Sequence, residues 1–229
     1  WVDCVVGIDN PTPRAAIIKT NRPIRAVLEF MYTKCMFTEQ KFQIPSLAGI
    51  SEKTIEEHLK LYAGYVKNAN GIIEKMATIN SETDPYIAGE LFRRFSFEYN
   101  GMRNHEVYFS SLEGGPTPLN PESVFGKRLL ELFGSYETFV KEFTALALTR
   151  GIGWAMLWYD KKQDSFLASW VDEQHLGQLQ GCTPLIALDM WEHSYVADYQ
   201  PSGKKQYVED FFRNLNWSVA EKYFEEAVK

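Results

Sequence analysis

The chain has 229 residues and a formal net charge of -6, and 45% of its residues are hydrophobic. This length can bury one large core or two small ones, and the negative charge argues against nucleic acid as a partner. No apolar run approaches the roughly 18 residues that a membrane-spanning helix needs, so we expect no membrane partner either.

The three cysteines indicate a compartment rather than a site. Cys4, Cys35 and Cys182 are widely spaced, and no two of them form a CxxC pair. This pattern is typical of a reducing compartment and offers neither a disulfide framework nor a thiolate zinc site. We therefore expect a cytoplasmic location. Because the chain begins at Trp1 rather than Met, a removed leader stays open as an alternative.

Residues 1–41 are an N-terminal extension to which the sequence assigns no role. The pair Arg22-Pro23 can open a short helix that ends near Lys34. Several aliphatic side chains in this stretch are apolar enough to pack against a core, but no motif says where.

The first long helix is predicted to follow Ser51 and to run to about Met76, because the Ser51 hydroxyl can accept a hydrogen bond from a first-turn amide. His58, Tyr62 and Tyr65 recur at three- and four-residue steps, so they share one face of this helix. A single histidine on such a face is more often a hydrogen-bonded core residue than a metal ligand.

A second long helix is predicted from Tyr86 to Leu112. Gly101 lies in its interior, with His105 four residues further on. An interior glycine weakens a helix by up to about 1 kcal/mol relative to alanine, and it often marks a close approach to the backbone. Two long helices joined by about ten residues form an antiparallel hairpin. This hairpin can turn His58 towards His105.

The stretch 113–121 holds two glycines and three prolines and is the clearest boundary in the chain. The elements predicted beyond it are helices over 122–132 and 135–149, strands over 153–159, 165–171 and 182–189, and helices over 191–199, 205–214 and 217–227. The predicted fold class is α+β, with an N-terminal antiparallel helical hairpin followed by an α/β domain that has a small antiparallel sheet of about three strands. We divide the chain into the extension 1–41, a helical-hairpin domain 42–117 and an α/β domain 118–229.

The third predicted strand ends in a carboxylate. The apolar run 184–188 leads directly into Asp189, and His193 follows four residues later. Aspartate is almost never fully buried unless it is paired or bound to metal. The sequence therefore predicts that Asp189 and His193 are two ligands of a metal site whose other ligands lie upstream.

Two of the remaining histidines, His58 and His105, can complete that site, which would then lie between the two domains. Three imidazoles and one carboxylate suit a first-row transition metal with room for a solvent ligand. A zinc hydrolase can use the same set, and scattered core histidines are the other alternative. Ligand types alone therefore do not establish a redox function.

The segment Asp189–Tyr195 resembles the D-x-W-E-H-[AS]-Y signature of the iron/manganese superoxide dismutases. Other segments resemble that family in the same order, namely 65–70, 104–109, 150–155 and 216–217. The resemblance covers about 42–229 and leaves out the extension. It implies an oxidoreductase that disproportionates superoxide anion to dioxygen and hydrogen peroxide through one redox-cycling Mn or Fe ion per subunit. It also implies that the metal ligands are His58, His105, Asp189 and His193.

The same resemblance implies which residues tune the metal. In this family a glutamine reaches the solvent on the metal, either from the helix position four residues before the second ligand or from the sheet region. The helix position is Gly101 here, so the resemblance assigns this role to Gln174, with the adjacent His175 as the alternative. We therefore expect manganese rather than iron. Tyr65 is the expected gateway tyrosine. Tyr65 and Gln174 are the two residues that we expect to be catalytic.

Three positions depart from the family pattern. Val66 stands eight residues after the first ligand, where many members have the gateway tyrosine, and Tyr65 lies one residue before it. Tyr62 stands where many members have a histidine, and Val196 stands where many have the tyrosine that bonds this histidine from the partner subunit. The joint replacement indicates a subclass with an altered contact between subunits. The resemblance further implies a homodimer or a dimer of dimers, in which Glu192 reaches the metal site of the partner subunit. Trp154 and Trp191 are expected to wall the site.

Two other functions compete with this interpretation. A superoxide dismutase-like structural or interaction protein that has lost its chemistry is expected to lack ligands. Another non-haem metalloenzyme, such as an iron oxygenase with two histidines and one carboxylate, would leave the fourth ligand idle.

Overall fold

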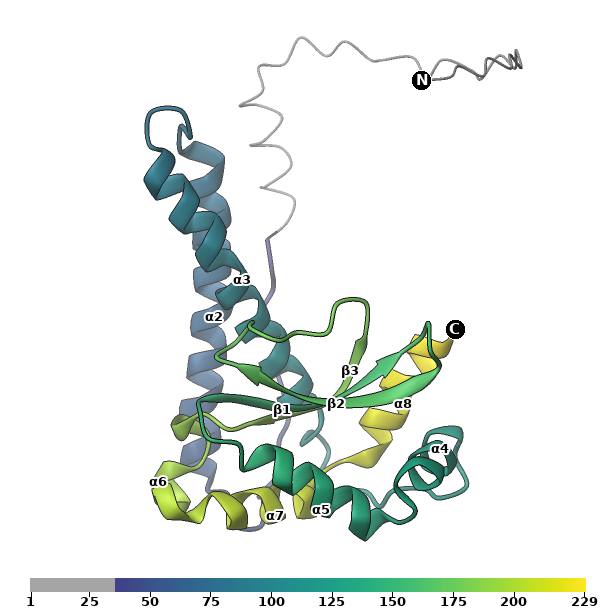
Figure 1. The fold of residues 1–229 in the computed structure, drawn as a ribbon. Helices are drawn as coiled ribbons and strands as arrows, with labels where there is room; N and C mark the ends of the chain where they lie inside the picture. The colour runs from purple at the N-terminus through teal and green to yellow at the C-terminus, as the bar shows by residue number, and fades with distance from the viewer. Residues whose placement is uncertain (1–35) are drawn as a thin grey trace, which may run out of the picture.

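The computed structural model describes residues 36–229, in which a projecting helical hairpin precedes a sheet covered by helices (Figure 1). The hairpin consists of α2 (Glu52–Thr78) and α3 (Pro85–Ser110). Ser51 caps α2 by accepting a hydrogen bond from the Thr54 amide at 3.2 Å, as the sequence predicts. The helix expected to end near Lys34 lies outside the described residues, as do two of the cysteines.

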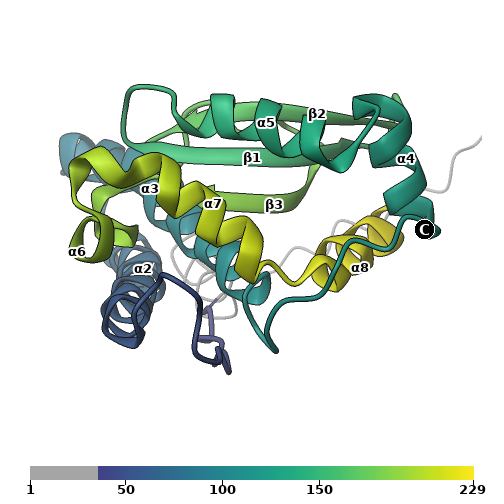
Figure 2. The same ribbon diagram turned by 90° about the horizontal axis from the view of Figure 1, so that it is seen from below.

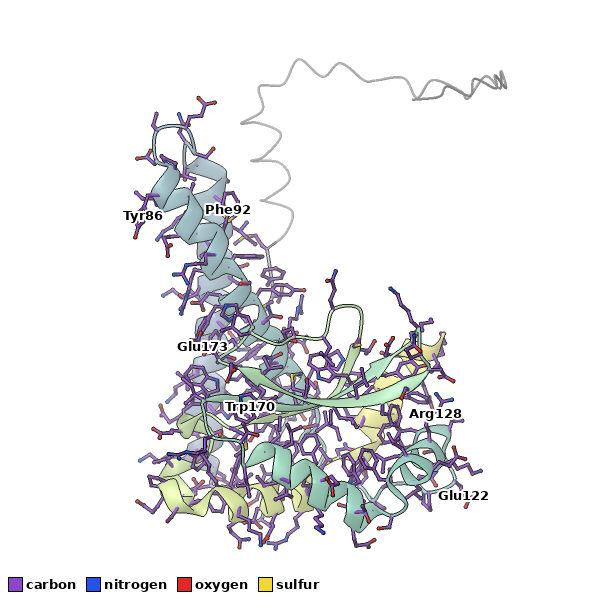
Figure 3. All side chains as sticks on the ribbon, viewed as in Figure 1. Tyr86, Phe92, Glu122, Arg128, Trp170 and Glu173 are labelled. Atoms are coloured by element: carbon purple, nitrogen blue, oxygen red, sulfur yellow. The ribbon has the colours of Figure 1, made fainter. Side chains whose placement is uncertain are left out.

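The far end of the hairpin is exposed and carries Tyr86 and Phe92, which Figure 3 labels there. Although α2 and α3 are long, polar and charged side chains recur along both of them. Within residues 36–229, none of the helices has the length and apolar character that would let it cross a bilayer.

The second half of the chain contains the sheet and the remaining helices. In chain order these elements are α4 (Val124–Phe133), α5 (Tyr136–Ala147), β1 (Gly153–Asp160), β2 (Ser165–Asp172), β3 (Thr183–Asp189), α6 (Val196–Tyr199), α7 (Lys204–Asn214) and α8 (Trp217–Val228). The three strands form one antiparallel sheet in the order β2-β1-β3. The predicted α+β fold class, with a hairpin followed by a three-stranded sheet, is confirmed.

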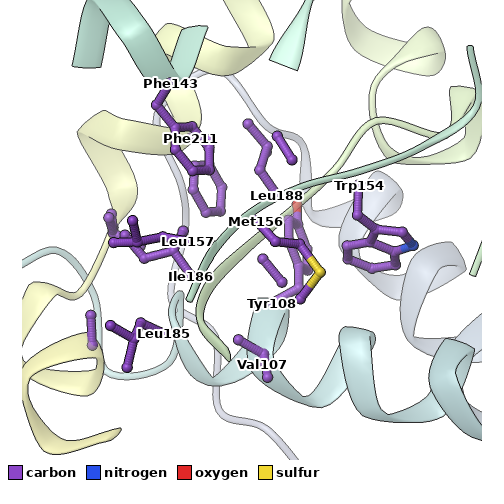
Figure 4. Packing of buried hydrophobic residues seen from close by; sticks show 14 of the residues in the cluster. Val107, Tyr108, Phe143, Trp154, Met156, Leu157, Leu185, Ile186, Leu188 and Phe211 are labelled. Carbon is purple, nitrogen blue, oxygen red and sulfur yellow. The ribbon is translucent and has the colours of Figure 1, made fainter. Parts of the chain in front are cut away.

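The central strand β1 is buried along almost its whole length, because it has a strand on either side and helices over both faces. Helix α3 packs against β3, while α5 packs against β1 and β2 (Figure 2). Side chains of β1 and β3 share one core with Phe143 of α5, Phe211 of α7 and Tyr108 of α3 (Figure 4). In the register of β1 and β3, Trp154 stands opposite Asp189, so the sheet itself places this indole beside the predicted site.

The prediction of a single helix over 191–199 is wrong. The structure has a 3-10 turn at Glu192–Ser194 and then the separate short helix α6. Ser194 donates its hydroxyl to the carbonyl oxygens of Asp189 and Trp191, at 2.9 and 2.7 Å. Such side-chain bonds to the backbone compete with regular helical bonding, and they keep the chain in a tight turn at the end of β3.

Leu157, which is fully buried in the middle of β1, is the position at which a core cavity should cost most. Leu157→Ala is expected to lower the free energy of unfolding by about 2–5 kcal/mol, measured by urea denaturation, because the surrounding strands cannot close the void. The matched control is Leu167→Ala in β2, where the leucine is 40% exposed. Its expected loss is about 1 kcal/mol or less. Equal losses at the two positions would contradict this account of the core.

Candidate metal centre

Four side chains from four separate elements converge where the hairpin meets the sheet. His58 comes from α2, His105 from α3, Asp189 from the end of β3, and His193 from the 3-10 turn. One ligand atom of each residue lies within 4.8 Å of those of the others. The side chains of the first three are fully buried, whereas that of His193 keeps 23% of its surface exposed. The structure therefore brings together the four residues that the sequence analysis singled out.

A single carboxylate oxygen faces the three imidazoles. Asp189 Oδ2 lies 3.1 Å from Nε2 of His58, 3.1 Å from Nε2 of His193 and 3.6 Å from Nε2 of His105. The other oxygen, Oδ1, accepts the backbone N–H of Trp191 at 2.8 Å, which fixes the orientation of the carboxylate. All three imidazoles thus present the same nitrogen, Nε2, to one small volume.

The backbone sets the tautomer of His105. Its Nδ1 lies 2.5 Å from the carbonyl oxygen of Gly101, one turn earlier in α3, so Nδ1 carries the hydrogen and donates it. Nε2 is then the unprotonated nitrogen. This atom is buried and has no hydrogen-bond partner among the described residues. A buried nitrogen without a hydrogen-bond partner needs another binding partner. Because it lies beside two other imidazole nitrogens and a carboxylate oxygen, a metal ion is the partner that fits.

The electrostatics of the group suit a cation. Burial lowers the pKa of His58, and it lowers the pKa of His105 to about 3, with His58 as the next contributor. Burial alone would raise the pKa of Asp189, but the charge and hydrogen bonds of His193 and His58 outweigh burial and hold that pKa far below its ordinary value. Burial alone would lower the pKa of His193, but the charge and hydrogen bond of Asp189 outweigh burial and raise it. The neutral His58 and His105 and the ionised carboxylate thus already have the protonation states that metal binding requires, and His193 would release its proton to a metal. The donor set of three nitrogens and one oxygen fits a first-row transition metal.

Gln174, on the loop after β2, is fully buried and holds two residues of the site by its amide. Trp154 Nε1 donates to Gln174 Oε1 at 2.8 Å, and Gln174 Nε2 donates to Tyr65 Oη at 2.9 Å. The rings of Trp154 and Tyr65 each lie 5.0 Å from the ring of His105, measured between centroids. The Gln174 amide is therefore linked to the site through both of its aromatic neighbours.

His175, the alternative to Gln174, has different surroundings. Its ring lies 5.6 Å from that of Phe97 in α3, and it is not among the four converging residues. The buried Nδ1 of His175 has no hydrogen-bond partner among the described residues. The structure therefore links Gln174, rather than His175, to the aromatic residues that pack on His105.

Gly101 leaves room for Tyr65. A Cβ atom at position 101 would lie 2.5 Å from Cδ1 of the Tyr65 ring, closer than atoms can approach. The expectation that something lies close to this backbone is confirmed. Burial raises the pKa of Tyr65, and the nearby Asp189 charge raises it further, so the hydroxyl keeps its proton at neutral pH.

The remaining predicted residues lie around this group. Trp191 stacks on His193 with ring centroids 5.9 Å apart, and its indole N–H donates to the carbonyl oxygen of Glu173 at 3.1 Å. Glu192, between these two rings in the sequence, is exposed. Tyr62 is fully buried, and burial raises its pKa to about 12.

Sequence reasoning missed three residues of α3 that support the site. Asn104 donates to the carbonyl oxygen of Gln174 at 3.0 Å, and Glu106 accepts the Tyr62 hydroxyl at 3.2 Å. The ring of Tyr108 lies 4.9 Å from that of His58. A signal for two of them was present, because Asn104 and Glu106 flank the predicted ligand His105 in the sequence, and an amide or a carboxylate is rarely buried without a partner.

Comparison with known proteins gives consistent matches. The alpha-hairpin domain of the iron/manganese superoxide dismutases matches residues 41–113, and the C-terminal domain of the same family matches residues 121–223. A superoxide dismutase [Fe] of Cupriavidus metallidurans is 36% identical over 187 residues, which is 80% of this chain and 92% of the relative. The mitochondrial superoxide dismutase [Mn] of Glossina morsitans morsitans is 32% identical over 210 residues, 90% of this chain and 94% of the relative. Superoxide dismutase [Mn] 2 of Haloferax volcanii is 35% identical over 185 residues, 79% of this chain and 89% of the relative.

The space at Gly101 leads to a prediction. Gly101→Ala is expected to destabilise the protein by about 1–3 kcal/mol, because the added methyl group must displace the Tyr65 ring. The control is Gly89→Ala in the same helix, where a Cβ meets no atom within 4 Å and the expected change is a gain of up to about 1 kcal/mol. Urea denaturation measures both. A neutral or stabilising Gly101→Ala would show that Tyr65 does not depend on this space.

Proposed function

The chain belongs to the iron/manganese superoxide dismutase family, and from this we propose how its own residues carry out the reaction. The protein is an oxidoreductase that disproportionates superoxide to dioxygen and hydrogen peroxide. We propose that His58, His105, Asp189 and His193 hold a single Mn or Fe ion. The observation that carries this proposal is the convergence of three Nε2 atoms on one buried carboxylate oxygen, within 4.8 Å of one another. When bound, such an ion supplies one-electron redox chemistry by alternating between its trivalent and divalent states.

The alternative functions are not favoured. All four ligand side chains are present and meet at one point. A superoxide dismutase-like structural or interaction protein without catalytic activity would not need to keep this arrangement. An iron oxygenase with two histidines and one carboxylate would leave one of three equivalent imidazoles without a role.

Tyr65 is well suited to deliver a proton. Its oxygen accepts a hydrogen bond from Gln174 Nε2, so its own O–H is left free to donate to a superoxide or solvent molecule beside the metal position. Because burial raises the pKa of Tyr65, this proton is present throughout the physiological range. The exposed part of His193 suggests that small molecules enter from its side of the site.

Gln174 is proposed to act on the solvent ligand of the metal. Its Oε1 is committed to Trp154 and one N–H to Tyr65, and the second N–H remains for a solvent molecule. A hydrogen bond of this kind stabilises one protonation state of the solvent and so shifts the redox potential. A glutamine from the sheet side, combined with a glycine at position 101, favours manganese over iron. The names of the relatives include both metals, so elemental analysis has to decide.

We further propose that the protein is a homodimer or a dimer of dimers. Glu192 is exposed and lies next to His193 in the sequence, which supports a role in reaching the metal site of a partner subunit.

The division into an extension of unknown role (1–41), a helical-hairpin domain (42–117) and an α/β domain (118–229) is supported by the separate matches of the two family domains. A cytoplasmic location remains our proposal, and cell fractionation tests it against the mitochondrial location that the name of one relative states.

The ligand assignment gives the first functional prediction. His105→Ala is expected to abolish metal retention and superoxide dismutase activity, because it removes a fully buried donor that no neighbour can replace. His175→Ala is the matched control and should keep its metal, since His175 lies outside the converging group. Elemental analysis of the purified proteins and an assay of superoxide loss measure the two effects. Full activity in His105→Ala would disprove the site assignment.

A second prediction separates holding the metal from tuning it. Gln174→Ala is expected to keep the metal, because the four ligands are intact, but to lose about 10- to 100-fold in activity. The ratio of the activities of the Mn-loaded and Fe-loaded forms should also change. Gln180→Ala, at an exposed glutamine, is the control and should behave like the unchanged protein. An unchanged metal preference in Gln174→Ala would refute the proposed role of this amide.

A further inference from the structure

A hydrogen-bonded cluster joins three segments of the chain beside the metal centre. Tyr62 Oη donates to Glu106 Oε1 at 3.2 Å and accepts the backbone N–H of Gln40 at 2.9 Å. Arg103 Nη1 donates to the other oxygen of Glu106 at 2.6 Å. The tyrosine is 0% exposed and the glutamate 7% exposed. The bond between them therefore connects α2 to α3 in the interior of the hairpin, away from solvent.

Both ends of this bond adjoin a ligand of the proposed metal. Tyr62 lies four residues after His58 on α2, so the two side chains share a helix face. Glu106 directly follows His105 on α3. The two imidazole rings are 4.9 Å apart between centroids. The bond thus joins the two helices close to the metal site, about one helical turn from His58 on α2 and next to His105 on α3.

Core packing does not explain why position 62 carries a hydroxyl and position 106 a carboxylate. The ring of Tyr62 packs against Phe42 and Phe109, with centroids 5.7 and 6.1 Å away, and a phenylalanine would make the same contacts. Burying a carboxylate in such surroundings is unfavourable unless it is hydrogen-bonded, and an aliphatic residue would fill the position of Glu106 without that cost. The polar atoms at both positions need an explanation other than volume.

We propose that Tyr62 and Glu106 are a positioning pair that holds α2 and α3 at the separation needed for His58 and His105 to bind one metal ion. This inference rests on the proposed metal site. The pair acts through the two helices and touches neither metal nor substrate. Gln40 extends it to the segment before α2, so the chain that enters the hairpin is fastened at the same point.

The test is the rate of metal loss from the metal-loaded protein. Tyr62→Phe keeps the ring and removes only the hydroxyl. When the Mn-loaded protein is challenged with EDTA and the retained metal is followed by elemental analysis, release should be about tenfold faster or more. Glu106→Leu should have the same effect. Glu106→Gln should release metal at close to the original rate, because its amide oxygen still accepts the Tyr62 hydroxyl.

Tyr199→Phe is the matched control. The Tyr199 hydroxyl donates to Asp210 Oδ2 at 2.9 Å, and this carboxylate is also buried, at 3% exposure. These two residues belong to α6 and α7, which carry none of the four proposed ligands. Tyr199→Phe should therefore leave the release rate unchanged. Hydrogen exchange of the peptides 58–66 and 102–109 adds a readout that does not depend on activity, and it should be faster in Tyr62→Phe than in the control.

The outcomes separate clearly. Metal release from Tyr62→Phe that is no faster than from Tyr199→Phe overturns the positioning pair, and so does a Glu106→Gln variant that behaves like Glu106→Leu. If Tyr62→Phe does not fold, the two Glu106 variants make the same comparison. A wild-type chain that retains neither Mn nor Fe, or a His105→Ala variant that retains its metal, overturns the proposed site and this inference with it.

Discussion

The buried carboxylate of Asp189 is the constraint on which the rest of the structure depends. An ionised group with no exposed surface is strongly unfavourable unless opposite charge and hydrogen bonds compensate for the lost water. The chain meets this requirement with imidazoles from α2, α3 and the turn after β3. None of these elements can move away without leaving the carboxylate uncompensated. The site therefore holds the hairpin against the sheet, and the proposed metal strengthens that junction when it binds.

A missing side chain is as important as those that are present. The absence of a Cβ at Gly101 lets the Tyr65 ring lie against α3, where it receives the N–H of Gln174 from the other half of the molecule. Trp154 holds the opposite end of the same amide, and its place is set by its register opposite Asp189. One loop amide is thus fixed by a helix on one side and by the sheet on the other, as a group that tunes a metal must be.

The sequence predicted the fold well because long periodic helices and apolar strands are determined locally. It failed at 191–199, where bonds from the Ser194 hydroxyl to the backbone override the helical pattern. The convergence of His58 and His105 was predictable from helix faces and a hairpin, whereas their chemical roles stay predictions until the metal is measured. The bond between Tyr62 and Glu106 could not be predicted, because it depends on how two helices are rotated about their axes, which the spacing of apolar residues fixes only loosely.

The residues that depart from the family pattern support one interpretation when they are taken together. Tyr62 stands where the resemblance leads one to expect a histidine bonded to a partner subunit, and Val196, at the start of α6, has no hydroxyl to receive such a bond. In this chain the polar atom at position 62 bonds instead to Glu106 and Gln40 of the same subunit. This position therefore bonds within the chain, where the resemblance leads one to expect a bond to a partner subunit. In our proposals, the positioning pair sets the spacing of the first two ligands within one chain, and the contact with a partner subunit falls to Glu192 rather than to Tyr62.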